Sequence, residues 1–149
     1  MPMENATNKK LIMLVDDSEE DTFLFRHAAN KVRDDIVIST HLDATALLEK
    51  LKTERASDAT HTPDLIFIDI NMPSMDGMAF LQALKSDENL NNVPALMFST
   101  SAYRKDIDFC YHHGASGYLV KPSSNRDLVN KLNHVFDYWI DTVEATQTH

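Results

Sequence analysis

The chain has little that would stabilise it covalently or take it into a membrane or onto nucleic acid. Its single cysteine, Cys110, cannot form an internal disulfide, and no apolar stretch approaches the ~20 residues that span a bilayer. The formal charge of −9 opposes binding to phosphate backbones or anionic lipid. The first nine residues lack the apolar core of a secretory signal. We expect a cytoplasmic protein that binds neither nucleic acid nor membrane.

The length and composition predict a single compact domain. A chain of 149 residues with 43% hydrophobic residues can bury one substantial core but is too short for two ordinary domains. We place the domain at residues 10–144, after a polar leader at 1–9 and before a polar tail at 145–149.

Short apolar runs alternate with segments of helical spacing along the chain. The expected strands lie at residues 11–15, 36–39, 65–68, 95–98 and 118–120. The helix after the first strand is expected to face inward through Phe23, Leu24, Ala28 and Val32. Five strands alternating with five helices predict an α/β fold, a doubly wound parallel sheet with helices on both faces.

Charged residues follow three of these strands directly. Asp16 and Asp17 follow the first strand, Asp69 the third, and Lys121 the fifth. The carboxyl ends of parallel strands meet at one edge of the sheet, so we expect these side chains to share a pocket. Crowded carboxylates need a cation, and an all-oxygen ligand set without paired cysteine or clustered histidine favours Mg²⁺. One carboxylate could then attack phosphorus, while Lys121 and the hydroxyl of Ser99 hold phosphoryl oxygens.

Four motifs at these strand ends carry a family resemblance: DD at 16–17, DINMPSMDG at 69–77, ST at 99–100 and GYLVKP at 117–122. Together they resemble the receiver domain of bacterial response regulators, over roughly residues 10–140. The resemblance implies a flavodoxin-like sheet of strand order 2-1-3-4-5. It also implies a response regulator that accepts a phosphoryl group from a histidine kinase, with output by docking or onward phosphotransfer. Such a protein is no conventional enzyme, although it catalyses its own phosphorylation and dephosphorylation.

The resemblance assigns a role to each matching residue. Asp69 is the phosphoacceptor and Lys121 the phosphate-binding lysine. Asp16, Asp17 and Asp69, with the backbone carbonyl of Asn71, are the metal ligands. Ser99 is the switch hydroxyl, Tyr118 is the aromatic residue that changes rotamer with it, and the peptide bond between Lys121 and Pro122 is cis.

Within the family, three segments look most like the stand-alone regulators associated with bacterial phytochrome kinases. They are the polar stretch at 53–63, expected to be a loop, the STSA sequence at 99–102, and YWIDTV at 138–143. The resemblance therefore implies a sensor histidine kinase of the phytochrome type as the partner.

Two other functions stay open at this point. A Mg²⁺-dependent phosphatase of the haloacid dehalogenase type also phosphorylates an aspartate at a strand end, although its DxDx[TV] pattern lies on the first strand. A receiver-like binding module that does not use phosphate is the second alternative. The complete set of acids and the lysine disfavours it, because a scaffold has no need for buried charge repulsion.

The last helix has a wider apolar stripe than one sheet face requires. Phe136 and Ile140 add a second row beside Trp139 and its helical neighbours. We therefore expect Phe136, Trp139 and Ile140 to pack against a second copy of the chain, forming a homodimer.

Overall fold

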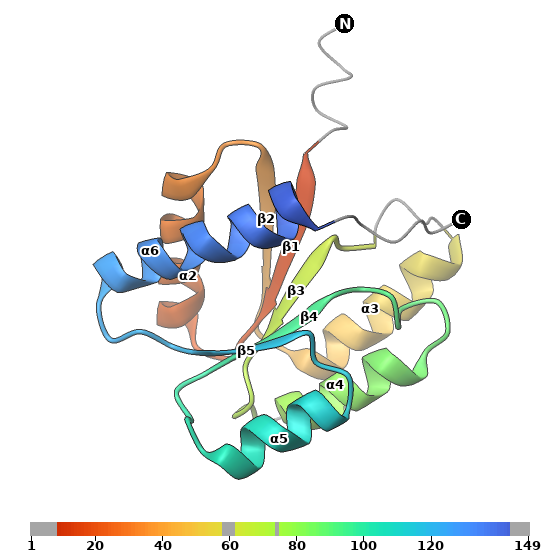
Figure 1. Ribbon diagram of the computed structural model, residues 1–149. Helices are drawn as coiled ribbons and strands as arrows, with labels where there is room; N and C mark the ends of the chain where they lie inside the picture. Colours follow the sequence, from red (N-terminus) through yellow and green to blue (C-terminus); the bar gives the residue numbers. More distant parts are fainter. Residues whose placement is uncertain (1–8, 58–61, 74, 144–149) are drawn as a thin grey trace, which may run out of the picture.

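A parallel sheet forms the centre of the domain, with its strands in the order β2-β1-β3-β4-β5. The computed structural model describes residues 9–57, 62–73 and 75–143 (Figure 1). The strands are β1 (Lys10–Val15), β2 (Ile36–His41), β3 (Leu65–Ile68), β4 (Ala95–Ser99) and β5 (Gly117–Val120). Both the fold class and the strand order predicted from the sequence are confirmed.

Helices cover both faces of this sheet. They are α2 (Glu19–Val32), α3 (Ala44–Ser57), α4 (Gly77–Ser86), α5 (Arg104–His112) and α6 (Asn125–Phe136), and α6 continues into a π-helical turn, η2 (Asp137–Thr142). Figure 1 shows α2 and α6 on one face and α3, α4 and α5 on the other. The expected loop at 53–63 is partly wrong, because α3 extends through Ser57, and residues 58–61 lie outside the described residues.

Alternate residues of the strands supply two separate cores. Met13, Val15, Ile66 and Ile68 pack toward α3, α4 and α5, whereas Ile12, Leu14 and Phe67 pack toward α2 and α6. A strand buried on both faces must be apolar at successive positions, which explains the continuous runs in the sequence. No helix in the described part of the chain is long and apolar enough to cross a membrane.

The prediction of which residues α2 buries is wrong at the start of the helix. Phe23 is 66% exposed and Leu24 is 37% exposed, while Phe25 is completely buried. Phe25 packs edge-on against Phe67 and Phe98, with ring centroids 4.8 and 5.8 Å away. Three successive apolar residues allow more than one helical phase, and the aromatic cluster across the interface selects the phase that buries Phe25.

The prediction that Phe136 packs against a second copy of the chain is also wrong. Phe136 is fully buried in the core beneath α6, where its ring lies edge-on to Phe67 at 6.3 Å. It therefore stabilises the chain's own fold and offers no surface to a second copy. Trp139 and Ile140 are only partly buried against the same core.

Candidate functional site

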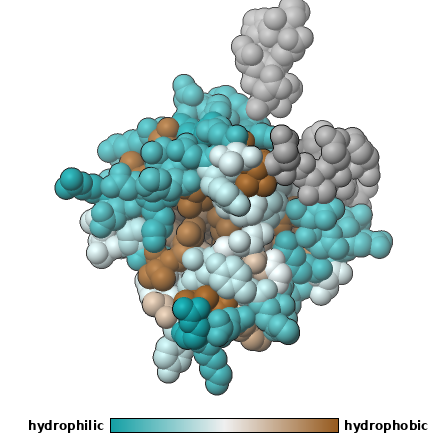
Figure 2. Space-filling view, in the orientation of Figure 1, coloured by the Kyte–Doolittle hydropathy of each residue, from teal (hydrophilic) through white to brown (hydrophobic). Residues whose placement is uncertain are grey.

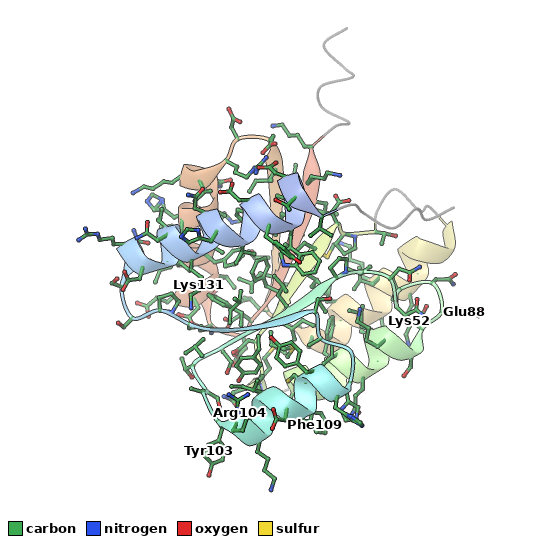
Figure 3. All side chains as sticks on the ribbon, viewed as in Figure 1. Lys52, Glu88, Tyr103, Arg104, Phe109 and Lys131 are labelled. Carbon is green, nitrogen blue, oxygen red and sulfur yellow. The ribbon has the colours of Figure 1, made fainter. Side chains whose placement is uncertain are left out.

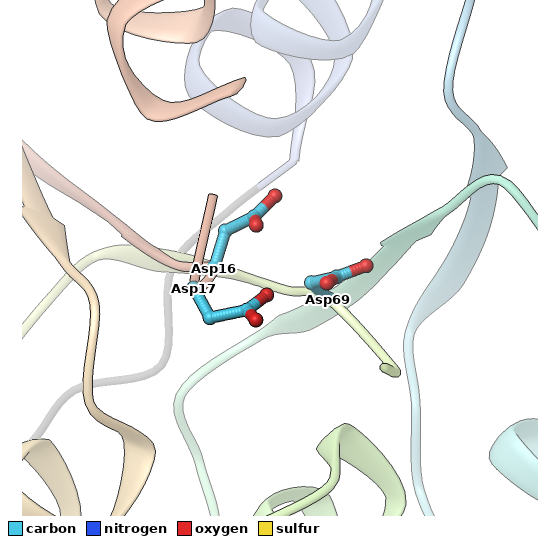
Figure 4. Close-up of side chains that lie close together, drawn as sticks. All are labelled: Asp16, Asp17 and Asp69. Atoms are coloured by element: carbon cyan, nitrogen blue, oxygen red, sulfur yellow. The ribbon is translucent and has the colours of Figure 1, made fainter. Parts of the chain in front are cut away.

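Three carboxylates converge at the carboxyl edge of the sheet, as predicted. Asp16 and Asp17 follow β1 and Asp69 follows β3, and one ligand oxygen from each lies within 4.8 Å of the others (Figure 4). Asp16 is 1% exposed and Asp69 is 6% exposed, whereas Asp17 is exposed to solvent. The cluster therefore combines two buried acids with one that solvent reaches.

Strand register explains why residues so distant in sequence meet. Val15 of β1 pairs with Ile68 of β3, so the residues that follow them leave the sheet side by side. The backbone N–H of Asp69 continues the ladder by donating to the carbonyl of Val15 at 3.0 Å. Asp16 is fixed in turn, because one of its carboxylate oxygens accepts the N–H of Ser18 at 2.9 Å.

Lys121 enters the same cluster from the end of β5. Its Nζ donates to Asp16 Oδ2 at 2.7 Å and to Asp21 Oδ2 at 2.8 Å, and it lies 3.5 Å from Asp69 Oδ1. The contact with Asp21 was not predicted, because an acid in the first turn of a helix is already explained by the helix dipole. Asp21 contributes a fourth carboxylate to the surroundings of this ammonium group.

Burial and neighbouring charge move the pKa values of Asp69 and Lys121. Burial is the main cause that raises the pKa of Asp69 to about 6; the charge of Asp16 adds to the effect, and Lys121 opposes it. For Lys121, burial alone would lower the pKa, but the hydrogen bonds to Asp16 and Asp21 outweigh it, and the net shift is upward. At neutral pH Asp69 is thus mainly ionised, beside a lysine that stays charged.

Ser99 and Tyr118 lie at the neighbouring strand ends and are connected through one residue. Ser99 is completely buried at the end of β4, and its Oγ accepts the N–H of Ser101 at 3.1 Å. The hydroxyl of Tyr118, on β5, donates to the carbonyl of Ser101 at 2.8 Å. Burial raises the pKa of Tyr118. The sequence placed Ser99 and Tyr118 in this region, but gave no reason to single out Ser101.

The loop after Asp69 contains a close contact that the sequence did not reveal. Asn71, expected to contribute its backbone carbonyl, lies exposed in this loop. The N–H of Gly77, at the start of α4, donates to the carbonyl of Ile70 at 2.7 Å. A Cβ on Gly77 would lie 2.0 Å from the carbonyl oxygen of Asp69, so only glycine allows α4 to approach this backbone.

One expectation from the resemblance is wrong. No peptide bond within the described residues is cis, and the bond between Lys121 and Pro122 is therefore trans. Trans is the intrinsically favoured form of an X–Pro bond.

The donor set suits a hard divalent cation. All the side-chain donors of the cluster are carboxylate oxygens, which are the ligands that such ions prefer, and the acids outnumber the single ammonium group. A cation held there would neutralise the excess negative charge. The residues present therefore fit a metal ion of the Mg²⁺ or Mn²⁺ type.

Comparison with known proteins agrees with this geometry. The sequence profile of the response regulator receiver domain matches residues 12–133. The chain belongs to this family. Receiver domains are the phosphoacceptor modules of two-component signalling, and the phosphatase alternative raised by the strand-end aspartate is therefore rejected.

The relatives of this receiver domain include stand-alone regulators. Response regulator Rcp1 of Synechocystis sp. is 27% identical over 94% of this chain and 95% of its own length. Chemotaxis protein CheY-3 of Vibrio cholerae is 30% identical over 91% of this chain and 98% of its own.

Solved structures give the same result for the fold and add two chemical states. The phosphorylated cyanobacterial phytochrome response regulator RcpA has a TM-score of 0.84 at 28% identity, covering 93% of this chain and 99% of that one. The Mn²⁺-bound form of Rcp1 has a TM-score of 0.81 at 26% identity, with the same coverage. Both the recognised family and the likeness to phytochrome-associated regulators are confirmed.

Proposed function

We propose that Asp69 of this receiver domain accepts a phosphoryl group from a phosphohistidine of a sensor kinase. The observation that carries this proposal is the position of Asp69, a buried carboxylate 3.5 Å from the ammonium group of Lys121 and clustered with Asp16 and Asp17. The chain then passes the signal on by docking to a partner or by transferring the phosphoryl group further.

Each residue of the site has its own role in the phosphoryl transfer. With a pKa of about 6, Asp69 is ionised at neutral pH and presents a nucleophilic oxygen. That oxygen bonds to phosphorus as the bond from phosphorus to the histidine nitrogen breaks, which leaves an acyl phosphate on Asp69. Lys121 binds a phosphoryl oxygen through its ammonium group, and the hydroxyl of Ser99 donates to another.

We infer that the cation of the site is Mg²⁺ and that Asp16, Asp17, Asp69 and the backbone carbonyl of Asn71 hold it. The oxygen donors and the Mn²⁺-bound relative support a divalent ion of this class. When bound, it supplies positive charge to the phosphoryl oxygens and lowers the repulsion among the acids. The same site, open to solvent beside Asp17, would let water hydrolyse the acyl phosphate, which is the basis for proposing autodephosphorylation.

The likeness to Rcp1 and RcpA supports a kinase of the phytochrome type as the partner, since RcpA is named as a phytochrome response regulator. Co-incubation with a phosphorylated phytochrome kinase and an unrelated histidine kinase tests this inference. Equal transfer rates from the two would contradict it. The cytoplasmic location stays a prediction.

We further propose a homodimer formed by the face between α5 and α6. Figure 2 shows apolar surface over β5 in this region. All four residues of β5 are partly exposed, and Trp139 and Ile140 in η2 are half-buried apolar side chains. Sedimentation at micromolar concentration is expected to show a dimer that Trp139→Glu dissociates, and a monomeric wild type would contradict the proposal.

Intact mass after incubation with acetyl phosphate and Mg²⁺ tests the central proposal. We expect one phosphoryl adduct on the wild type and none on Asp69→Asn or in the presence of chelator. Asp108→Asn is the matched control, because Asp108 is exposed on α5 and pairs only loosely with Arg104, at 3.5 Å. An adduct that persists in Asp69→Asn would place the phosphoryl group elsewhere, and no adduct at all would favour the phosphate-independent binding module.

A further inference from the structure

Ser101 lies in the turn between β4 and α5 and joins two residues of the site through its backbone. Its N–H donates to the Oγ of Ser99 at 3.1 Å, and its carbonyl accepts the hydroxyl of Tyr118 at 2.8 Å. A displacement of either hydroxyl therefore acts directly on the main chain of Ser101.

The side chain of Ser101 reaches in the other direction, to the start of α5. Its hydroxyl donates to Asp106 Oδ2 at 2.9 Å and accepts the backbone N–H of Tyr103 at 3.2 Å. Tyr103 is the residue that precedes the helix, and its side chain makes no capping hydrogen bond. Ser101 thus satisfies an N–H at the helix start and binds the acid in the first turn, as a capping side chain commonly does.

We propose that Ser101 is a positioning residue that couples the hydroxyl of Ser99 to the first turn of α5. This proposal rests on the proposed function, because a phosphoryl group reaches Ser99 only when Asp69 carries it. The hydroxyl of Ser99 has a single proton to donate, and its oxygen moves toward the phosphoryl group when the proton is donated there. The N–H of Ser101 then follows or loses its acceptor, and its hydroxyl transmits the change to Asp106 and Tyr103.

The element that Ser101 holds is exposed at the surface. Tyr103 is 71% exposed, and Figure 3 shows Tyr103 and Arg104 at the start of α5, with the Tyr103 ring directed away from the domain. A shift in the first turn of α5 would therefore change the surface that a partner meets.

Amide hydrogen exchange of the full chain, measured by NMR, tests the coupling. In the unmodified protein, Ser101→Ala is expected to speed exchange in residues 103–107 about tenfold, the effect of a lost helix cap, and Ser101→Thr should restore protection. Asp106→Ala, which removes the acceptor of the Ser101 hydroxyl, is measured beside Asp108→Ala as its control, because Asp108 carries the same charge on the same helix and pairs with Arg104.

The decisive comparison adds beryllofluoride, a phosphoryl analogue, together with Mg²⁺. Wild type and Ser101→Thr should show altered exchange at residues 99–101 and at 103–107. In Ser101→Ala the change should stop at residues 99–101. Transmission to 103–107 that is undiminished in Ser101→Ala would overturn the proposal while leaving phosphorylation of Asp69 intact.

A second arm separates this proposal from the proposed function. If acetyl phosphate gives no adduct on the wild type, a cycle of Ser99→Ala and Asp106→Ala in the unmodified protein decides the question. Non-additive exchange in residues 103–107 that becomes additive in a Ser101→Ala background supports the coupling. Additive effects with Ser101 present overturn it.

Discussion

Aspartates lie beside a basic side chain in two places in this molecule, but their pKa values shift in opposite directions. At the site, burial and the charge of Asp16 raise the pKa of Asp69 to about 6. At the far end of α2, Arg33 bonds both Asp35 and Asp141 at 2.7 to 3.0 Å and lowers the pKa of both acids. The setting at the sheet edge therefore disfavours the charge of Asp69, whereas Arg33 stabilises the charges of Asp35 and Asp141 in a solvated position.

The difference separates a site that needs a ligand from a contact that needs none. The Arg33 cluster joins the end of α2 to η2, where Asp141 is 108 residues from Arg33 in sequence, and both of its acids are already bonded to the guanidinium group. The acids at the sheet edge share one ammonium group, and a cation or phosphoryl group changes their balance.

Removing Lys121 should have the largest effect. Asp16 is buried, and loss of its 2.7 Å partner leaves an uncompensated charge, so Lys121→Met should lower the free energy of unfolding by about 3–5 kcal/mol in chelator. Mg²⁺ should restore part of the loss. Urea denaturation with and without Mg²⁺ measures both effects. The control is Lys131→Met, which removes an ammonium group that donates to the neutral carbonyl of Val120 at 3.0 Å; equal losses in the two variants would refute the argument.

Neutralising Asp69 should stabilise the metal-free protein above pH 6. Well below its ordinary pKa of 3.8 the carboxyl is neutral in both states; between 3.8 and its folded value of about 6 the unfolded chain ionises first, so wild-type stability falls as pH rises. Asp69→Asn removes this penalty, by about 3 kcal/mol at most. Urea denaturation in chelator from pH 4 to 8 should show the two proteins diverging, and parallel curves would contradict it.

Adding a methyl group at Gly77 should disturb the site through the backbone. The new Cβ would collide with the carbonyl of Asp69, so α4 must move, and Gly77→Ala should cost about 1–3 kcal/mol and slow adduct formation. Gly114→Ala is the comparison, because Gly114 has a φ of 102° at the end of α5, where strain lowers stability far from the acids. If both variants are phosphorylated at the wild-type rate, the contact at Gly77 has no influence on Asp69.

Breaking the Arg33 cluster should have the smallest effect and the opposite pH dependence. Asp141→Asn should lower stability slightly at neutral pH, because the contact is exposed and screened by salt. Since Arg33 lowers the folded pKa of Asp141, its contribution is present above the ordinary aspartate range and is lost as pH falls through the lowered value. Denaturation at low and high salt, compared with wild type, measures it; a difference that grows on acidification would contradict this sign.

Much of the site could be predicted because it depends on where strands end. Continuous apolar runs marked the strands, and the residues after them, Asp16, Asp69 and Lys121, meet because parallel strands share one edge. Asp21 and Ser101 were missed because a capping acid and a turn serine have ordinary local explanations. The prediction of a cis peptide bond before Pro122 was also wrong, and only the family resemblance had suggested that bond.

The sequence alone determined the alternation of strands and helices, the family and the acids of the site, because these depend on local periodicity and on residue type at strand ends. Tertiary structure alone decided which face of α2 is buried, that Phe136 belongs to the core, and that Gly77 contacts the backbone of Asp69. The physical reason is that these outcomes depend on the shape of surfaces packed from distant segments. Such surfaces exist only after the sheet has formed.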